Sequence, residues 1–90
     1  DDALAQSQMG MTYFALSRFD LAEKYLTEAV RLDPSHFSHP QILLAEIYLR
    51  RGDKLKAADQ LESFVRHHPD YPGAPKMRVA ISEYRGSVKD

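Results

Sequence analysis

Apolar side chains recur at intervals of three and four residues along most of the chain, which is the spacing of one face of an α-helix. Proline or glycine interrupts this pattern at Pro34, Pro40, Gly52 and Pro69, and both residue types are typical of helix ends. No stretch shows the alternation of a half-buried strand. We therefore expect an all-α chain whose consecutive helices pack antiparallel, because the connections are short. The predicted helices cover residues 2–17, 20–33, 40–51, 53–68 and 75–86.

Each predicted helix carries one apolar face, and Asp2, Asp20 and Asp53 stand where they can cap or open helices. We expect these faces to meet in a common core. The expected core faces consist of Met9, Gly10, Tyr13 and Leu16 in the first helix, of Leu21, Ala22, Tyr25, Leu26, Ala29 and Val30 in the second, of Leu55, Ala58, Leu61 and Val65 in the fourth, and of Met77, Ala80, Ile81, Tyr84 and Val88 in the fifth.

The chain contains one phrase twice, because "LTEAVRLDPSH" (26–36) reappears as "LESFVRHHPDY" (61–71), 35 residues later. Leu26 matches Leu61, and Pro34 matches Pro69. At the same spacing the match extends back to Gly10 with Ala45, Tyr13 with Tyr48, and Ala22 with Ala57. The repeated unit is therefore a helical hairpin, and the fifth helix begins a third copy.

This hairpin resembles the tetratricopeptide repeat, whose pattern is W-x₂-L-G-x₂-Y, then A-x₃-F, then P, over about 34 residues. Phe37 accounts for the one extra residue in the observed spacing. The positions L, G, Y, A, F and P of the pattern fall on Met9, Gly10, Tyr13, Ala22, Leu26 and Pro34 in the first copy and on Leu44, Ala45, Tyr48, Ala57, Leu61 and Pro69 in the second.

The resemblance implies a right-handed superhelical solenoid that forms one domain over residues 1–90. Its parts would be a first repeat over 3–36, a second over 38–71, and a fifth helix over 74–88 that is either a cap or the start of a third repeat. Because the chain lacks an initiator Met, we expect a piece of a longer protein.

Two departures from the family pattern bear on packing. Gln6 and Gln41 stand where the family often has Trp. Phe64 stands at a site usually held by a small residue, such as Ala29 in the first copy. That site lies where one hairpin meets the next, so we expect the fifth helix to pack differently from the third.

Composition and charge exclude several classes of function. Hydrophobic residues make up 43% of the chain, charged residues 28%, and the formal net charge is −1, so the sequence has no basic footprint for nucleic acid. The longest apolar run, "ILLAEIYL", is too short to span a membrane. Cysteine is absent, which rules out disulfides and leaves the compartment open.

Candidate chemistry is limited to four histidines, His36, His39, His67 and His68, which lie in or next to the two connectors between hairpins. A zinc site needs about four ligands in fixed geometry, so we expect solvated loop histidines and no metal. No nucleophile elbow, phosphate-binding glycine loop or H-E-x-x-H motif is present. We expect a non-catalytic domain that needs no cofactor.

Binding is the class of function that these observations leave open. In the tetratricopeptide repeat family the concave surface comes mainly from the first helix of each hairpin, so the resemblance implies a protein or peptide partner there. A polar clamp for acidic chaperone tails is disfavoured, because Ser7, Met11 and Leu43 stand at its places. The alternative is a structural or self-assembly element whose apolar face pairs with a second copy or with its parent protein. The expected binding residues are Ser7, Met11 and Phe14 in the first helix, Ile42, Glu46, Leu49 and Arg50 in the third, and Met77, Ile81 and Arg85 in the fifth.

Overall fold

The computed structural model describes residues 1–86, and this part of the chain forms five α-helices and no strand. Helices α1 (Asp2–Ala15) and α2 (Phe19–Leu32) form the first hairpin, α3 (Pro40–Arg50) and α4 (Lys54–His67) form the second, and α5 (Ala74–Gly86) follows. The predicted all-α class is confirmed. Val88, which we placed on the core face of the fifth helix, lies outside the described residues.

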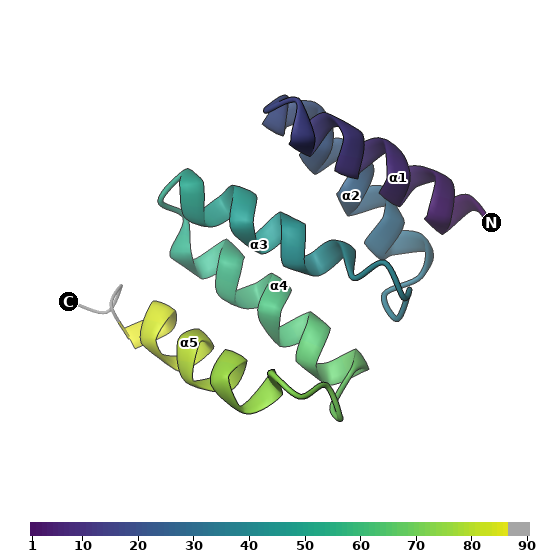
Figure 1. Cartoon of the computed structure of the whole chain (residues 1–90). Helices are drawn as coiled ribbons and strands as arrows, with labels where there is room; N and C mark the ends of the chain where they lie inside the picture. Colours follow the sequence, from purple (N-terminus) through teal and green to yellow (C-terminus); the bar gives the residue numbers. More distant parts are fainter. Residues whose placement is uncertain (87–90) are drawn as a thin grey trace.

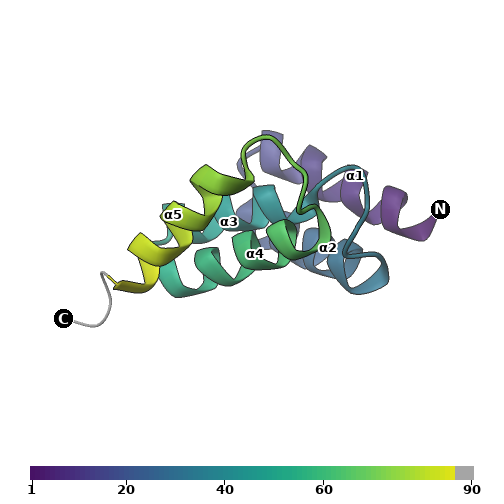
Figure 2. The ribbon, with the colours of Figure 1, turned by 90° about the horizontal axis from the view of Figure 1, so that it is seen from below.

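The helices stack in chain order, so that each helix packs against the next and α1 also touches α3. Two perpendicular views place α1 and α5 at opposite ends of the stack (Figures 1 and 2). The molecule is elongated, with extents of 38 × 28 × 18 Å. This nearest-neighbour arrangement is that of a helical-hairpin solenoid, which confirms the predicted fold.

The helix ends follow local chemistry, with two differences from the predicted caps. Asp53 caps α4 by accepting a hydrogen bond from the Lys56 amide, and Pro40 occupies the first turn of α3. The cap of α1 is Asp1 rather than Asp2, because the Asp1 carboxylate accepts from the third following amide. Helix α2 begins at Phe19 without a side-chain cap. Asp20 lies in its first turn, where a negative charge complements the helix dipole.

The core runs along the seams between consecutive helices. Leu26, Leu44, Ile47 and Phe64 are fully buried there. Gly10 permits the close approach of α1 and α2, because a Cβ built on it would lie 2.5 Å from Leu26 Cγ. A small residue at the G position of the repeat pattern is therefore required by the packing of this hairpin.

The predicted core face of α1 is wrong in part. Met9 is 42% exposed and Leu16 is 64% exposed, whereas the buried residues of α1 are Ala3, Ser7 and Gly10. Helix α1 lies at the end of the stack and packs mainly on α2, so only a narrow stripe of it is covered. The small side chains on that stripe let the helices approach closely.

An arginine clamp ties the second helix of each hairpin to the helix that follows it. Arg51, just after α3, contacts Asp20 and Glu23 of α2 at 2.7 and 2.6 Å. Arg85 of α5 contacts Asp59 and Glu62 of α4 at 3.0 Å each.

The two arginine clamps differ in register. A 35-residue offset from Asp20 and Glu23 leads to Leu55 and Ala58, yet the second acidic pair lies four residues further along α4. Four residues are about one helical turn. The connector 68–73 is also one residue shorter than the connector 33–39. The second clamp therefore engages α4 nearer to its C-terminal end than the first clamp engages α2, in line with the altered packing expected for the fifth helix.

Candidate functional site

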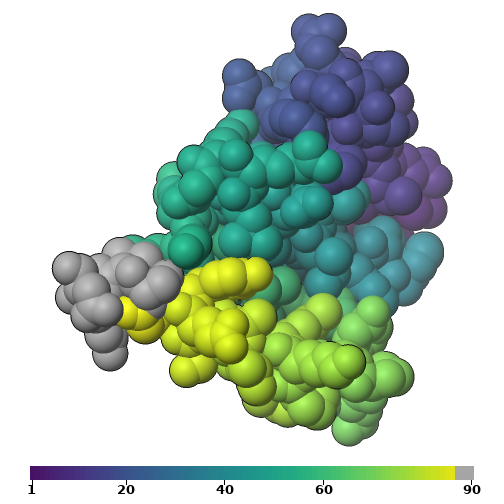
Figure 3. Space-filling model, turned by 60° about the vertical axis from the view of Figure 1, so that its left-hand side comes forward, coloured from purple at the N-terminus to yellow at the C-terminus, as the bar shows by residue number. Residues whose placement is uncertain are grey.

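A groove of about 400 Å³ opens on the face that α1, α3 and α5 share. The space-filling view shows this succession, from purple through teal to yellow (Figure 3). The groove is mostly apolar, because only one of its eight lining residues is charged. They are Phe14 of α1, Ile42, Leu43, Ala45, Glu46 and Leu49 of α3, Leu61 of α4, and Met77 of α5.

Helix α3 forms most of the groove because its sequence is apolar on two faces. Leu44, Ile47 and Tyr48 point into the core. Ile42 and Leu49 are partly buried and lie on the groove side, two turns apart on the helix. The run "ILLAEIYL" therefore supplies apolar side chains both to the core and to the groove. Helix α3 has two apolar faces for this reason.

The rim of the groove carries an aromatic pair covered by a guanidinium group. Phe14 and Phe19 meet edge to face with ring centroids 5.4 Å apart. The guanidinium of Arg50 lies 5.7 Å from the Phe14 ring and 5.2 Å from the Phe19 ring, and it pairs with Glu46 at 3.8 Å. These contacts hold the charged side chains at the edge, where they cancel each other, and leave the floor apolar.

Six of the ten predicted binding residues lie together at this groove. Phe14, Ile42, Glu46, Leu49 and Met77 line it. Arg50 lies on its rim, over the ring of the groove residue Phe14.

The structure places the other four predicted binding residues elsewhere. Ser7 is fully buried, and its hydroxyl is hydrogen-bonded to that of Ser38 at 2.7 Å. Met11 is 46% exposed but does not line the groove. Ile81 is buried in the core, and Arg85 is held in the second arginine clamp. We leave these four residues out of the proposed binding surface.

Sequence reasoning missed three lining residues, Leu43, Ala45 and Leu61. The sequence predicts Leu61 on the core face of the fourth helix. With 9% exposure it belongs to the core and also lines the groove. In the sequence, Leu43 stands at a place of the polar clamp and makes such a clamp unfavourable. Its position directly after Ile42 in a run of apolar residues was the signal that α3 has a second apolar face.

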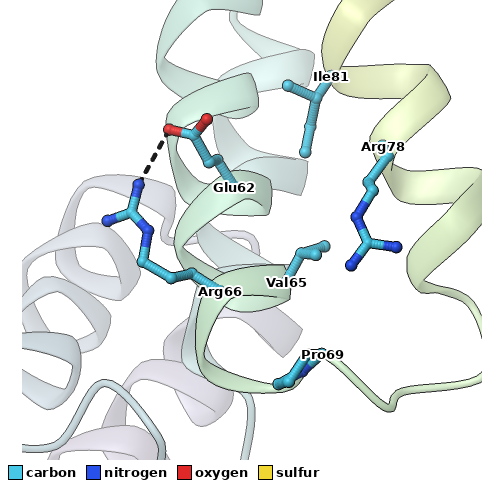
Figure 4. Close-up of a pocket in the computed structure, with 6 residues that line it drawn as sticks. All are labelled: Glu62, Val65, Arg66, Pro69, Arg78 and Ile81. Carbon is cyan, nitrogen blue, oxygen red and sulfur yellow. Dashed lines mark hydrogen bonds and ion pairs between the residues drawn. The ribbon is translucent and has the colours of Figure 1, made fainter.

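A second hollow, of about 390 Å³, lies between α4 and α5 (Figure 4). Val65, Pro69 and Ile81 form its apolar part, but the Val65 and Ile81 side chains are already buried. Arg66 pairs with Glu62 at 3.3 Å, and the Arg78 side chain extends from α5 toward Val65. Three of its six lining residues are thus charged, against one of eight at the groove, which makes this hollow a weaker candidate for a hydrophobic ligand than the groove.

The expectation of solvated loop histidines is wrong for His36. That ring is 3% exposed, and its Nδ1 lies 2.7 Å from the Ser38 hydroxyl. Burial also lowers the pKa of His39, with a further contribution from His68. Within residues 1–86, no group of three or more potential ligand side chains could hold a metal ion.

Comparison with known proteins gives a consistent result. Two family models, both described as tetratricopeptide repeat, match residues 3–36 and 41–71. The comparisons with curated proteins and with solved structures found no match. Within the described part of the chain, no helix is long and apolar enough to cross a membrane.

Proposed function

The chain belongs to the tetratricopeptide repeat family, whose members are generally protein–protein interaction modules, and we propose that it binds a peptide or helix of a partner protein in the groove between α1, α3 and α5. The observation that carries this proposal is the convergence of apolar side chains from separate helices on one concave surface. Its volume is within the range of ligand sites.

The chemistry of the groove indicates what kind of partner segment fits. Glu46 and Arg50 neutralise each other at the rim, so apolar contacts supply most of the affinity. Ile42 and Leu49 lie two turns apart on α3, which suits a ligand with apolar anchors at regular spacing. An amphipathic helix or an extended peptide with two or three such anchors meets this requirement.

We also propose that the domain is non-catalytic and binds neither cofactor nor nucleic acid. The charged groups at the groove are one carboxylate and one guanidinium, which pair with each other, and a reaction needs groups that are free to act on a substrate. The net charge of −1 supports the absence of a nucleic-acid partner.

Substituting Leu49 tests the binding surface. We expect Leu49→Glu to weaken binding of an amphipathic peptide selected against the wild type at least about tenfold, because a buried, unpaired carboxylate costs more than 1.4 kcal/mol. Val79→Glu is the matched control, since Val79 is 59% exposed and does not line the groove. Affinity is measured by calorimetry, and circular dichroism checks that each variant is helical. Equal affinities for wild type and Leu49→Glu, or equal losses in both variants, would refute the proposed site.

The alternative function is self-assembly through apolar side chains that α1 leaves exposed. Met11 exposes 46% of its surface on one side of the helix, whereas Met9 and Leu16 expose 42% and 64% on the other side. If the Met11 side pairs with a second copy, light scattering shows a wild-type dimer at micromolar concentration that Met11→Glu converts to a monomer of lower thermal stability. If the wild type is a monomer, this alternative is excluded.

A further inference from the structure

Two imidazole rings meet where α3, α4 and the connector 68–73 come together. The rings of His39 and His68 are 4.8 Å apart between centroids. Phe64 packs against both of them, at 4.9 and 4.7 Å, and Tyr71 packs against His39 at 5.8 Å. We call these four side chains the imidazole–aromatic cluster.

The cluster contains no carboxylate to compensate a positive charge. His68 Nε2 is buried without a hydrogen-bond partner. The titratable groups that face His39 are His68 and Tyr71, and His39 faces His68 in turn. Among residues 1–86 no carboxylate forms an ion pair with either ring, the one such histidine contact being that of His36 with Asp1. Protonation would therefore place a charge among apolar rings and beside a second imidazole, which is unfavourable.

The backbone conformation of His39 is also unusual. Its φ of +54° lies in the left-handed region, which is uncommon for residues other than glycine and is retained only where surrounding contacts enforce it. The ring contacts of the imidazole–aromatic cluster are such contacts. Loosening them removes what holds the start of α3 in this conformation.

The cluster is also attached to α5. Tyr71 packs against Phe64 at 5.0 Å, and its carbonyl accepts a hydrogen bond from the amide of Ala74, the first residue of α5, at 2.9 Å. Near the other end of α5, the Arg85 clamp holds the helix to α4 independently of this contact. A displacement of the connector would thus free the N-terminal end of α5 first.

We propose that His39 and His68 form an acid-sensitive latch, in which protonation of the imidazole pair detaches the connector 68–73 and releases the N-terminal end of α5 from α4. The latch is a property of the fold, and it stands whether or not the groove binds a peptide.

The direction of the pH effect follows from the burial of His39. Burial and the neighbouring His68 hold the pKa of His39 below its usual 6.5, so the folded chain favours the neutral ring. A histidine whose pKa is lower in the folded chain than in the unfolded chain stabilises the fold at pH values above the unfolded-state pKa. This stabilisation is lost as the pH falls toward the folded-state pKa. The latch is therefore closed above about pH 6.5 and opens as the pH falls below that value.

Hydrogen exchange on the whole chain tests the latch. We expect the protection factors of α5 amides, corrected for intrinsic exchange, to fall relative to those of α2 as the pH is lowered from about 7.5 to about 5, because the folded chain favours the neutral His39 ring. In the same series, NMR follows the carbon-bound ring protons of all four histidines. The loss of protection should share its midpoint with the titration of His39 or His68.

Variants separate the latch from general acid sensitivity. His39→Asn removes a titrating group and keeps a residue that tolerates the left-handed region, while His68→Phe keeps a ring against Phe64. Each should reduce the pH response, and the double variant should abolish it. His67→Gln, the control, replaces a half-buried histidine that lies outside the cluster and should keep the wild-type response.

Three results would overturn the proposal. One is α5 protection in the wild type that stays constant relative to α2. Another is a midpoint that matches neither His39 nor His68. The third is a double variant that retains the wild-type response. If the double variant does not fold, the wild-type midpoints alone decide.

Discussion

The hydroxyl of Tyr48 shows how one buried group depends on its neighbours. It donates a hydrogen bond to Glu23 at 2.7 Å. Burial, together with that bond and the charge of Glu23, raises the pKa of Tyr48 to about 12. Burial alone would raise the pKa of Glu23, but hydrogen bonds from Arg51 and Tyr48 and the charge of Arg51 lower it. The carboxylate is thus stabilised by the same contacts that keep the phenol neutral.

The raised pKa of Tyr48 predicts a loss of stability at alkaline pH. The folded chain favours the neutral phenol, so its contribution is complete below about pH 10 and is lost as the pH rises toward 12. Absorbance of tyrosinate should show one tyrosine that ionises near pH 12 in the folded protein. Tyr48→Phe should lack this step, and its free energy of unfolding should fall less than that of the wild type between about pH 10 and 12. A tyrosinate titration that is identical in both proteins would contradict the assignment.

Helix packing depends on where small residues stand, and Gly10 at the α1–α2 crossing is the clearest case. Alanine favours a helix over glycine by about 1 kcal/mol, so Gly10→Ala would stabilise an open helix. Here the added methyl meets Leu26 Cγ at 2.5 Å and the Leu26 amide nitrogen at 3.2 Å. We expect overpacking to outweigh propensity and to give a net loss of about 1–2 kcal/mol in the free energy of unfolding.

Chemical denaturation measures the effect of Gly10→Ala, and Gly86→Ala is the control. A Cβ at Gly86, which also lies in a helix, would meet no atom within 4 Å. If Gly10→Ala is as stable as the wild type, α1 and α2 do not approach as closely as the structure shows.

Most of the element structure was predictable from the sequence, because apolar spacing and the positions of proline and glycine determine where these helices begin and end. The buried face of α1 could not be predicted in this way, because the exposed residues Met9 and Leu16 follow the same helical spacing as buried residues do. Only the number of neighbouring helices decides what is covered. The register of the second arginine clamp was also hidden, because Asp59, Glu62 and Arg85 look like ordinary surface charges until the packing of α5 on α4 is known.

The linear stacking of helices predicts how stability is distributed over the whole molecule. Helices α2, α3 and α4 each pack between neighbours on both sides, whereas α5 packs on α4 alone and α1 packs mainly on α2. In such arrays stability is approximately a sum of nearest-neighbour terms. At about pH 7.5, hydrogen exchange should therefore be slowest in α2, α3 and α4 and faster in the two end helices, α1 and α5. Uniform protection from α1 to α5 would show a single cooperative unit instead.

At this scale the candidate site was predictable in outline. The family resemblance indicated the first helices of the hairpins, and six of the ten named residues meet at one groove. The places of the other residues depended on side-chain contacts that the spacing of residue types along the chain does not record. Ser7 is covered because the connector carries Ser38 onto it, and Leu61 of α4 lines the groove although it also belongs to the core.

The unequal arginine clamps have a consequence for any ligand that would lie across α1, α3 and α5. In a strictly periodic array, a peptide with evenly spaced anchors can slide by one repeat and find the same contacts again. Here the second clamp holds acidic residues four positions further along its helix than the first clamp does, so a shift of 35 residues does not map one clamp onto the other. The two halves of the surface are therefore not interchangeable, and a ligand shifted by one repeat would meet different contacts.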